Sequence, residues 1–274
     1  MAAQHLLVLT AHPDDEGFGL AGTLARCAAE GWHITVVCAT RGEVGEIRDP
    51  TLATRETLPR VREQELRDAC AVLGVHDVRL LGYRDSGMEG TPENADPRAL
   101  INADPEAVIA DYDRLLRELR PSVVVTWDPA GGYGHPDHRA VHRLATAAVQ
   151  RARDAGYSTA VLYYMVAPVE MFDEMARELA AQGIEFVSEE IRAAIQRLPH
   201  LPPTTAIDVR PWLPQKLTSM ARYRTQIGQD DLFARLPERL REKMLATEYF
   251  HRALPSWHAA GEGATLEAFF AVAT

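Results

Sequence analysis

The chain has 274 residues, of which 46% are hydrophobic and 25% charged, a balance typical of one large folded domain or two small ones. Its formal net charge is -10, which argues against a nucleic acid partner because phosphate binding requires a basic surface. No apolar run approaches the roughly 18 residues of a membrane span and no basic leader precedes one, so we expect no membrane partner, no signal peptide and a cytoplasmic location.

Short apolar runs alternate with helical segments through the first part of the chain. The runs are continuous, as in parallel strands buried on both faces, and they cover residues 6–10, 34–39, 78–81, 123–127 and 161–166. Apolar stripes at helical spacing predict helices over residues 19–30, 60–73, 105–119 and 137–153. This alternation predicts an α/β fold: a doubly wound, mostly parallel Rossmann-like sheet with helices on both faces. Its ligand site is expected beyond the carboxyl ends of the strands.

Two long polar segments interrupt this rhythm, and the pattern changes after residue 166. Residues 40–58 and 82–104 follow strands and contain glycine and proline, and loops of this length in a compact domain are usually functional. The later pattern predicts one or two helices within 169–198, a strand at 206–209, and helices near 211–224 and 234–246.

We interpret residues 1–274 as a single domain. Residues 1–167 form its α/β core with the functional site, and residues 168–274 form a C-terminal elaboration of helices and a strand. The three cysteines are odd in number and form no CxxC pair, so we expect them to be reduced core residues: Cys27, Cys38 and Cys70. The pattern leaves the oligomeric state open.

Two His-Pro-Asp triplets follow apolar strands and carry the chemistry of the chain. The first, in the run HPDDE, places His12 and Asp15 on either side of a tight turn, so that both can face one point. The second, in the run GGYGHPDH, contains His135 and His138 and leads into a helix. Two histidines and one carboxylate suit a divalent transition metal and leave coordination positions open for a reaction.

A hydrolytic metal site also needs a base beside the activated water. Asp14 adjoins Asp15 and is the natural proton acceptor. A lone triplet of this kind is more often only a turn that caps a helix, but two at equivalent strand ends favour a site. The same ligand types also occur in non-haem Fe(II) oxygenases, which remain a more remote alternative.

Most of the chain resembles the LmbE-like (PIG-L-type) N-acetylglucosaminyl de-N-acetylases. The resemblance is carried by the two triplet motifs and extends, in order, through GEVGEI, RVREQEL, YRDSGM, LRPSVVVTWDP and KLTSMARYRTQI. It looks closest to the deacetylases of bacillithiol and mycothiol biosynthesis and to the thiol-conjugate amidases. The family implies a Rossmann-like fold and an amino-sugar substrate.

The resemblance assigns the reaction centre by residue. It implies that His12, Asp15 and His138 hold Zn²⁺, with Fe²⁺ as the alternative metal, and that Asp14 is the general base. His135 corresponds to the histidine that assists at the carbonyl oxygen or the leaving amine. The implied reaction is hydrolysis of the acetamide of an N-acetylglucosamine conjugate, of the GlcNAc-malate or GlcNAc-inositol type. Cleavage of the amide in a thiol S-conjugate is the alternative.

The resemblance also assigns residues around that centre. It implies that Asp137 is a hydrogen-bond partner beside His135, and that Tyr133 helps to hold the oxyanion. It implies contacts with the sugar or its aglycone for Glu46, Arg62 and Asp85.

The sequence also gives expectations for three further residues. We expect His142 behind the ligands or facing solvent, and Trp127 in the core. Tyr223 stands where thiol-related members tend to carry histidine, so a contact there with the aglycone would change the substrate.

Overall fold

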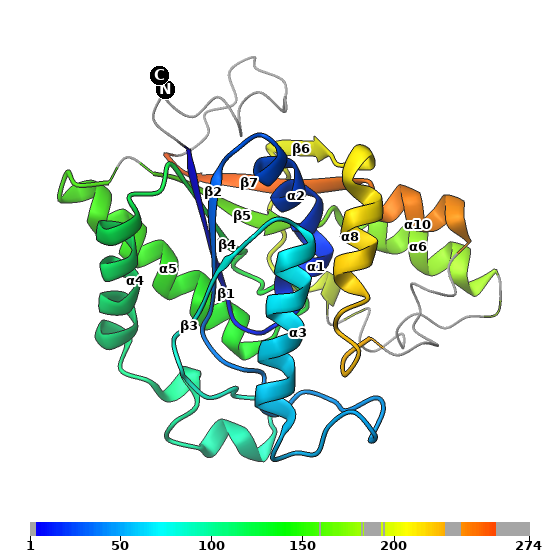
Figure 1. Ribbon diagram of the computed structural model, residues 1–274, viewed down its shortest axis with the longest axis horizontal. Coiled ribbons are helices and arrows are strands. Elements are labelled where there is room, and N and C mark those ends of the chain that lie inside the picture. The colour runs from blue at the N-terminus through cyan, green and yellow to red at the C-terminus, as the bar shows by residue number, and fades with distance from the viewer. Residues whose placement is uncertain are drawn as a thin grey trace.

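The computed structural model describes residues 4–158, 160–181, 183, 193, 195–227 and 237–255. These residues contain a seven-stranded sheet in the order β3-β2-β1-β4-β5-β7-β6 (Figure 1). The first five strands run parallel and lie within one residue of their predicted bounds; they are β1 (His5–Thr10), β2 (His33–Cys38), β3 (Asp77–Leu80), β4 (Val123–Trp127) and β5 (Val161–Val166). The α/β fold class predicted from the sequence is confirmed.

The C-terminal part adds two strands to the same sheet. The predicted strand forms as β6 (Thr205–Asp208), but β7 (Thr247–Leu254) was not predicted, and it lies antiparallel between β5 and β6. The buried carboxylate of Glu248 interrupts the apolar pattern of β7, which hides the strand in the sequence. This carboxylate accepts hydrogen bonds from the backbone of α2 and from Lys216 Nζ, at 2.7 Å.

The helices follow the sequence pattern with one break. The predicted helix at 19–30 forms as α2 (Ala21–Ala29). A short helix that was not predicted, α1 (Asp15–Gly19), precedes it and is separated from it by Leu20, which leaves helical geometry with φ -143°. The other helices are α3 (Leu58–Val72), α4 (Pro105–Leu119), α5 (Pro136–Asp154), α6 (Val169–Ala180), α8 (Leu213–Met220) and α10 (Glu238–Leu245). Short 3₁₀ turns cover Pro92–Ala95, Leu100–Asn102 and Arg210–Trp212.

Helices cover both faces of the sheet (Figure 1). Leu6 and Val8 of β1 point into a core shared with α2 and α3, whereas Leu7 and Leu9 point into a second core beneath α4 and α5. All four side chains are fully buried, as expected for a central parallel strand. The cysteines Cys27, Cys38 and Cys70 are free thiols within the first core.

The order of the strands locates the expected ligand site at the carboxyl edge of the sheet. From β1 the chain proceeds to β2 and β3 on one side, and it later places β4 on the other side of β1. The loops after β1 and β4 therefore leave adjacent strands in opposite directions, the arrangement at which open α/β sheets bind ligands.

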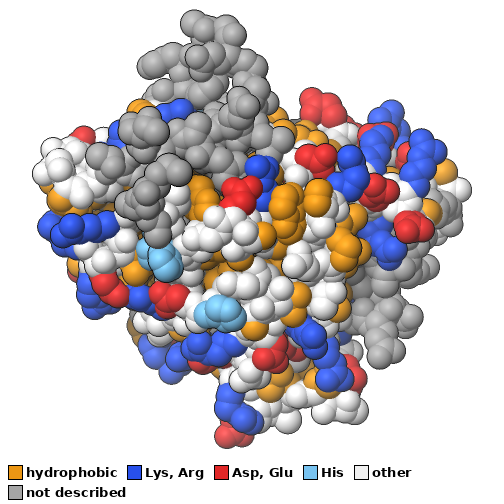
Figure 2. Space-filling model, turned by 45° about the horizontal axis from the view of Figure 1, so that its top comes forward, with side chains coloured by type: hydrophobic (Ala, Val, Ile, Leu, Met, Phe, Trp, Pro, Cys, Tyr) orange, Lys and Arg blue, Asp and Glu red, His pale blue; other side chains and the backbone are white. Residues whose placement is uncertain are grey.

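The surface shown in Figure 2 mixes basic and acidic side chains and does not gather either sign into one large patch. Among the described residues, no helix combines the length and apolarity required to cross a membrane.

Candidate metal centre

Asp15 lies at the start of α1, directly beyond the carboxyl end of β1. Its Oδ2 atom accepts three hydrogen bonds, from the backbone N–H groups of Ala11 (2.9 Å) and His12 (3.0 Å) and from Trp127 Nε1 (3.1 Å). The Oδ1 atom faces the two imidazoles instead, 3.2 Å from His138 Nε2 and 3.8 Å from His12 Nδ1. One carboxylate oxygen is thus anchored, and the other is directed at the two imidazoles.

The two imidazoles converge from the turn after β1 and from the first turn of α5. His12 Nδ1 and His138 Nε2 lie 3.2 Å apart, while the opposite nitrogen of each ring has its own partner. His12 Nε2 contacts Asp137 Oδ2 at 3.1 Å, and His138 Nδ1 contacts the carbonyl oxygen of Gly131 at 3.1 Å. Each outer nitrogen therefore donates, and the two inner nitrogens meet as lone pairs that require a proton or a cation between them.

The spacing of these atoms fits a small divalent cation. Four tetrahedral ligands at bond lengths of about 2.0–2.2 Å lie roughly 3.4 Å from one another. The three atoms of His12, Asp15 and His138 lie 3.2, 3.2 and 3.8 Å apart. A ring nitrogen of His135 also lies within 4.8 Å of those of His12 and His138. The donor set suits zinc or ferrous iron, and three protein ligands leave a position for water and substrate.

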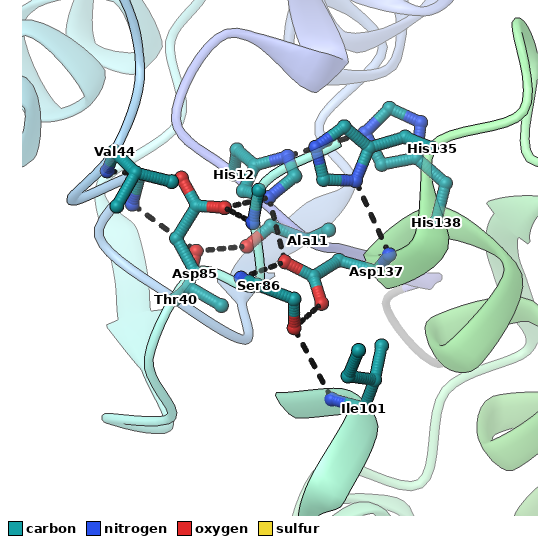
Figure 3. A network of polar contacts seen from close by, with 12 residues as sticks. Ala11, His12, Thr40, Val44, Asp85, Ser86, Ile101, His135, Asp137 and His138 are labelled. Atoms are coloured by element: carbon teal, nitrogen blue, oxygen red, sulfur yellow. Dashed lines mark hydrogen bonds and ion pairs between the residues drawn. The ribbon is translucent and has the colours of Figure 1, made fainter. Parts of the chain in front are cut away.

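Behind His12, two buried carboxylates complete a polar network (Figure 3). Asp85 Oδ1 lies 3.5 Å from His12 Nε2, and Asp137 accepts hydrogen bonds from the backbone and hydroxyl of Ser86. Burial disfavours the charged form of His12, but Asp85, Asp137 and Asp15 together raise its pKa well above the usual range. A histidine ligand commonly donates its outer N–H to a carboxylate in this way.

Asp14 adjoins the cluster in a strained backbone conformation. Its φ is 104°, a left-handed value that is unfavourable for a residue with a Cβ atom. Its Oδ2 atom accepts a hydrogen bond of 2.9 Å from Arg62, and 23% of its side chain is exposed. Burial raises the pKa of Asp14 to about 6, against the opposing effect of Arg62.

His135 and Tyr133 come from the loop before α5. His135 Nδ1 accepts the backbone N–H of Asp137 at 3.2 Å and so caps the helix, which leaves its Nε2 as the protonated nitrogen. Burial lowers the pKa of His135 to about 3. Tyr133 is 53% exposed, and its ring lies edge-on to His138 and His135, with centroids 5.4 and 6.1 Å away. Both side chains can therefore reach a ligand over the metal position.

The three residues that the resemblance assigns to the substrate differ in their surroundings. Arg62 is 3% exposed and donates to the carbonyl oxygens of Gly42 and Pro13 as well as to Asp14. Asp85 is also 3% exposed and lies behind His12, while Glu46 has a side chain that is 81% exposed. The structure thus brings Arg62 and Asp85 to the centre as supports, and leaves Glu46 at the surface.

Tyr223 and His142 both lie outside the metal cluster. Tyr223 is fully buried, and its hydroxyl donates to the carboxylate of Glu16, so its polar atom is directed at Glu16. Burial raises the pKa of Glu16 to about 8. His142 Nδ1 lies 2.9 Å from the carbonyl oxygen of Trp127 and takes no part in the metal cluster of described residues.

The comparisons with known proteins agree with this architecture. The family described as "PIG-L: GlcNAc-PI de-N-acetylase" matches residues 7–149, just over half of the chain, and includes both triplets. The 1D-myo-inositol 2-acetamido-2-deoxy-alpha-D-glucopyranoside deacetylase of Acidothermus cellulolyticus is 38% identical over 282 residues, covering 97% of this chain and 94% of the relative. The chain belongs to the PIG-L family.

Further matches extend the PIG-L likeness over nearly the whole chain. A deacetylase of the same name from Geodermatophilus obscurus is 39% identical and covers 90% of this chain and 91% of its own. The N,N'-diacetylchitobiose deacetylase from Pyrococcus horikoshii has a similar fold, with a TM-score of 0.63 at 22% identity over 92% of this chain and 84% of that one.

Two residues of this PIG-L chain reach the centre without being anticipated from the sequence. Trp127, expected only in the core, contacts Asp15 and stacks on His138, and Ser86 supports Asp137. The sequence positions of both residues could have identified them. Trp127 is the last residue of β4, at the edge of the sheet where ligands bind, and Ser86 lies in a long loop that follows β3.

Proposed function

We propose that this chain is a zinc-dependent N-deacetylase that hydrolyses the acetamide of an N-acetylglucosamine conjugate of the inositol type. The observation that carries the proposal is the convergence of His12 Nδ1, Asp15 Oδ1 and His138 Nε2 on one point, with the carboxylate of Asp14 beside them. The names of the two curated relatives, which match nearly end to end, support the amino-sugar and inositol parts of the substrate.

The metal supplies one part of the chemistry. A divalent cation held by His12, Asp15 and His138 would polarise the amide carbonyl and make a water molecule acidic enough to attack near neutral pH. Zinc is our first choice and ferrous iron the alternative, because two imidazoles and a carboxylate suit both.

Asp14 takes the proton from the attacking water. The bond from Arg62 occupies Oδ2, so Oδ1 is the atom available to accept it. The backbone strain at Asp14 fits this role, since strained residues persist where the surrounding structure holds a reactive group in place. A positioned base of this kind contributes about 10²–10⁴ in rate.

His135 and Tyr133 stabilise the negative charge that develops on the carbonyl oxygen. The bond from the Asp137 backbone to Nδ1 fixes the proton of His135 on Nε2, where the neutral ring donates a hydrogen bond to that oxygen. The proton that Asp14 takes from the water is the one that passes to the departing amine. The exposed hydroxyl of Tyr133 is the second donor. Each preorganised donor can lower the barrier by about 3–4 kcal/mol.

The test is release of free amine by zinc-loaded protein from three substrates: GlcNAc-inositol, GlcNAc-malate and a thiol S-conjugate. We expect the highest kcat/KM on GlcNAc-inositol and loss of turnover after chelation, with recovery on adding Zn²⁺. Preference for GlcNAc-malate would refute the inositol assignment, and turnover of the thiol conjugate alone would make the chain an amidase. Turnover that depends on oxygen and 2-oxoglutarate would refute the hydrolytic reading.

A further inference from the structure

Trp127 lies outside the proposed ligand set and contacts two of its members at once. Its indole Nε1 donates to Asp15 Oδ2 at 3.1 Å. Its ring stacks on the imidazole of His138, with centroids 4.0 Å apart and an angle of 8° between the planes. A tryptophan that served only to fill the core would need neither contact.

The indole N–H helps to fix which oxygen of Asp15 faces the metal position. Backbone donors from Ala11 and His12 already bind Oδ2, and the indole is its third donor. A carboxylate oxygen has two lone pairs, so three donors leave Oδ2 no capacity for a cation, and Oδ1 is the oxygen that remains for one. The indole therefore favours binding through one oxygen and opposes binding through both.

The stacking fixes the plane of His138. The contact with the Gly131 carbonyl sets which nitrogen of His138 carries the proton, and the parallel indole prevents rotation of the ring out of line. The indole is itself confined, because a Cβ atom on Gly132 would lie only 2.9 Å from Trp127 Cζ3. Gly132 has φ 66°, so both its backbone and this close approach suit glycine.

We propose that Trp127 is a positioning residue that sets the affinity and geometry of the metal site, by holding Asp15 to one oxygen and His138 to one plane. It acts through the ligands and touches no substrate. This inference rests on the metal site of the proposed function and is independent of the substrate.

Phenylalanine separates the two contacts, because it keeps an aromatic ring that can stack on His138 but has no N–H to donate. The variant is W127F, and W127L removes the stacking as well. Trp212→Phe is the matched control, since Trp212 is also partly buried against the same core and lies under Arg26 rather than beside the metal ligands.

The readouts are the Co²⁺ and Zn²⁺ affinities from chelator competition, the visible spectrum of the Co²⁺ form, and the melting temperature of the metal-free protein. We expect W127F to bind both metals 10- to 100-fold more weakly, because removal of a hydrogen-bond partner of a metal ligand typically has an effect of this size. We also expect it to shift the Co²⁺ absorption bands. W127L should bind more weakly still, while W212F should stay within twofold of the wild type. Unchanged affinity and spectrum in W127F would overturn the inference.

Two further outcomes keep the test decisive. Should W127F fail to fold, the wild type serves, because its four tryptophans give separate indole N–H signals in an NMR spectrum. The Trp127 signal should shift most on adding Zn²⁺, and an unmoved Trp127 signal would overturn the inference. Wild-type protein that binds neither metal would instead refute the metal site of the proposed function.

Discussion

Replacing Arg62 with leucine distinguishes an arginine that holds the base from one that holds the substrate. The guanidinium is buried and donates to the carbonyl oxygens of Pro13 (2.7 Å) and Gly42 (2.8 Å) and to Asp14 Oδ2 (2.9 Å). The loop between β2 and α3 packs directly against this guanidinium, so closely that a Cβ atom on Gly45 would lie 2.3 Å from Arg62. These contacts make Arg62 part of the frame around Asp14.

The expected losses of stability and of catalytic rate follow from the contacts that the substitution removes. Removing one partner of a buried ion pair costs about 3–5 kcal/mol, and the 23% exposure of the Asp14 side chain places this case near the lower end, about 3 kcal/mol. The left-handed backbone of Asp14 stores about 1–3 kcal/mol, which relaxation would release once Arg62 no longer holds it. A shift of the base by about 1 Å costs roughly 10² in rate.

R62L should therefore unfold at lower urea concentration and lose about 10² in kcat, with KM almost unchanged. The measurements are urea unfolding followed by circular dichroism and steady-state kinetics on the proposed substrate. Arg60→Leu is the control, since Arg60 is exposed on the same helix and should change stability by less than about 0.5 kcal/mol. A rise in KM with kcat and the unfolding midpoint unchanged would contradict this reasoning and restore Arg62 as a substrate contact.

Three more substitutions test separate parts of the assembly. Asp14→Asn should retain zinc by metal analysis and lower kcat by about 10²–10⁴, whereas loss of zinc would make Asp14 a ligand. Ser86→Ala removes the hydroxyl donor to Asp137 and should weaken zinc about 10-fold in chelator competition; an unchanged affinity would separate Asp137 from the site. Lys216→Met leaves Glu248 without its cation and should cost about 3 kcal/mol in urea unfolding. Because that pair joins α8 to β7, we expect one unfolding transition for residues 1–274, and two transitions would divide the proposed single domain.

The strands of the core were predictable because each is buried on both faces and is therefore apolar throughout. β7 escaped prediction because its inward side chains include Glu248, whose cost of burial is offset by Lys216 and by the backbone of α2. The break at Leu20 escaped for a related reason: Leu20 and Leu24 are both buried, so the apolar stripe continues through the point where the backbone turns.

The convergence of the two triplets was predictable from strand order alone. Each follows a parallel strand, and the carboxyl ends of β1 and β4 lie side by side, which brings His12 and His138 together. Supports such as Arg62 and Tyr223 were not predictable, because they come from α3 and from beyond α8, and a sequence pattern does not show that an arginine is buried. Both instead contact residues adjacent to Asp15 in the chain, namely Asp14 and Glu16.

The charge balance at His12 gives the strongest physical reason for a cation at this point. Arg62 pairs with Asp14, which leaves the buried carboxylates of Asp15, Asp85 and Asp137 around one imidazole. Burying three negative charges costs several kcal/mol for each unless positive charge accompanies them. Protonation of the His12 imidazole offsets only one of these negative charges. A divalent cation between His12 and His138 offsets two, and it uses the nitrogen lone pairs that already point at each other. The arrangement is therefore expected to gain stability on metal binding, by RT ln(1 + [metal]/Kd), and a melting temperature that stays constant as zinc is added would contradict it.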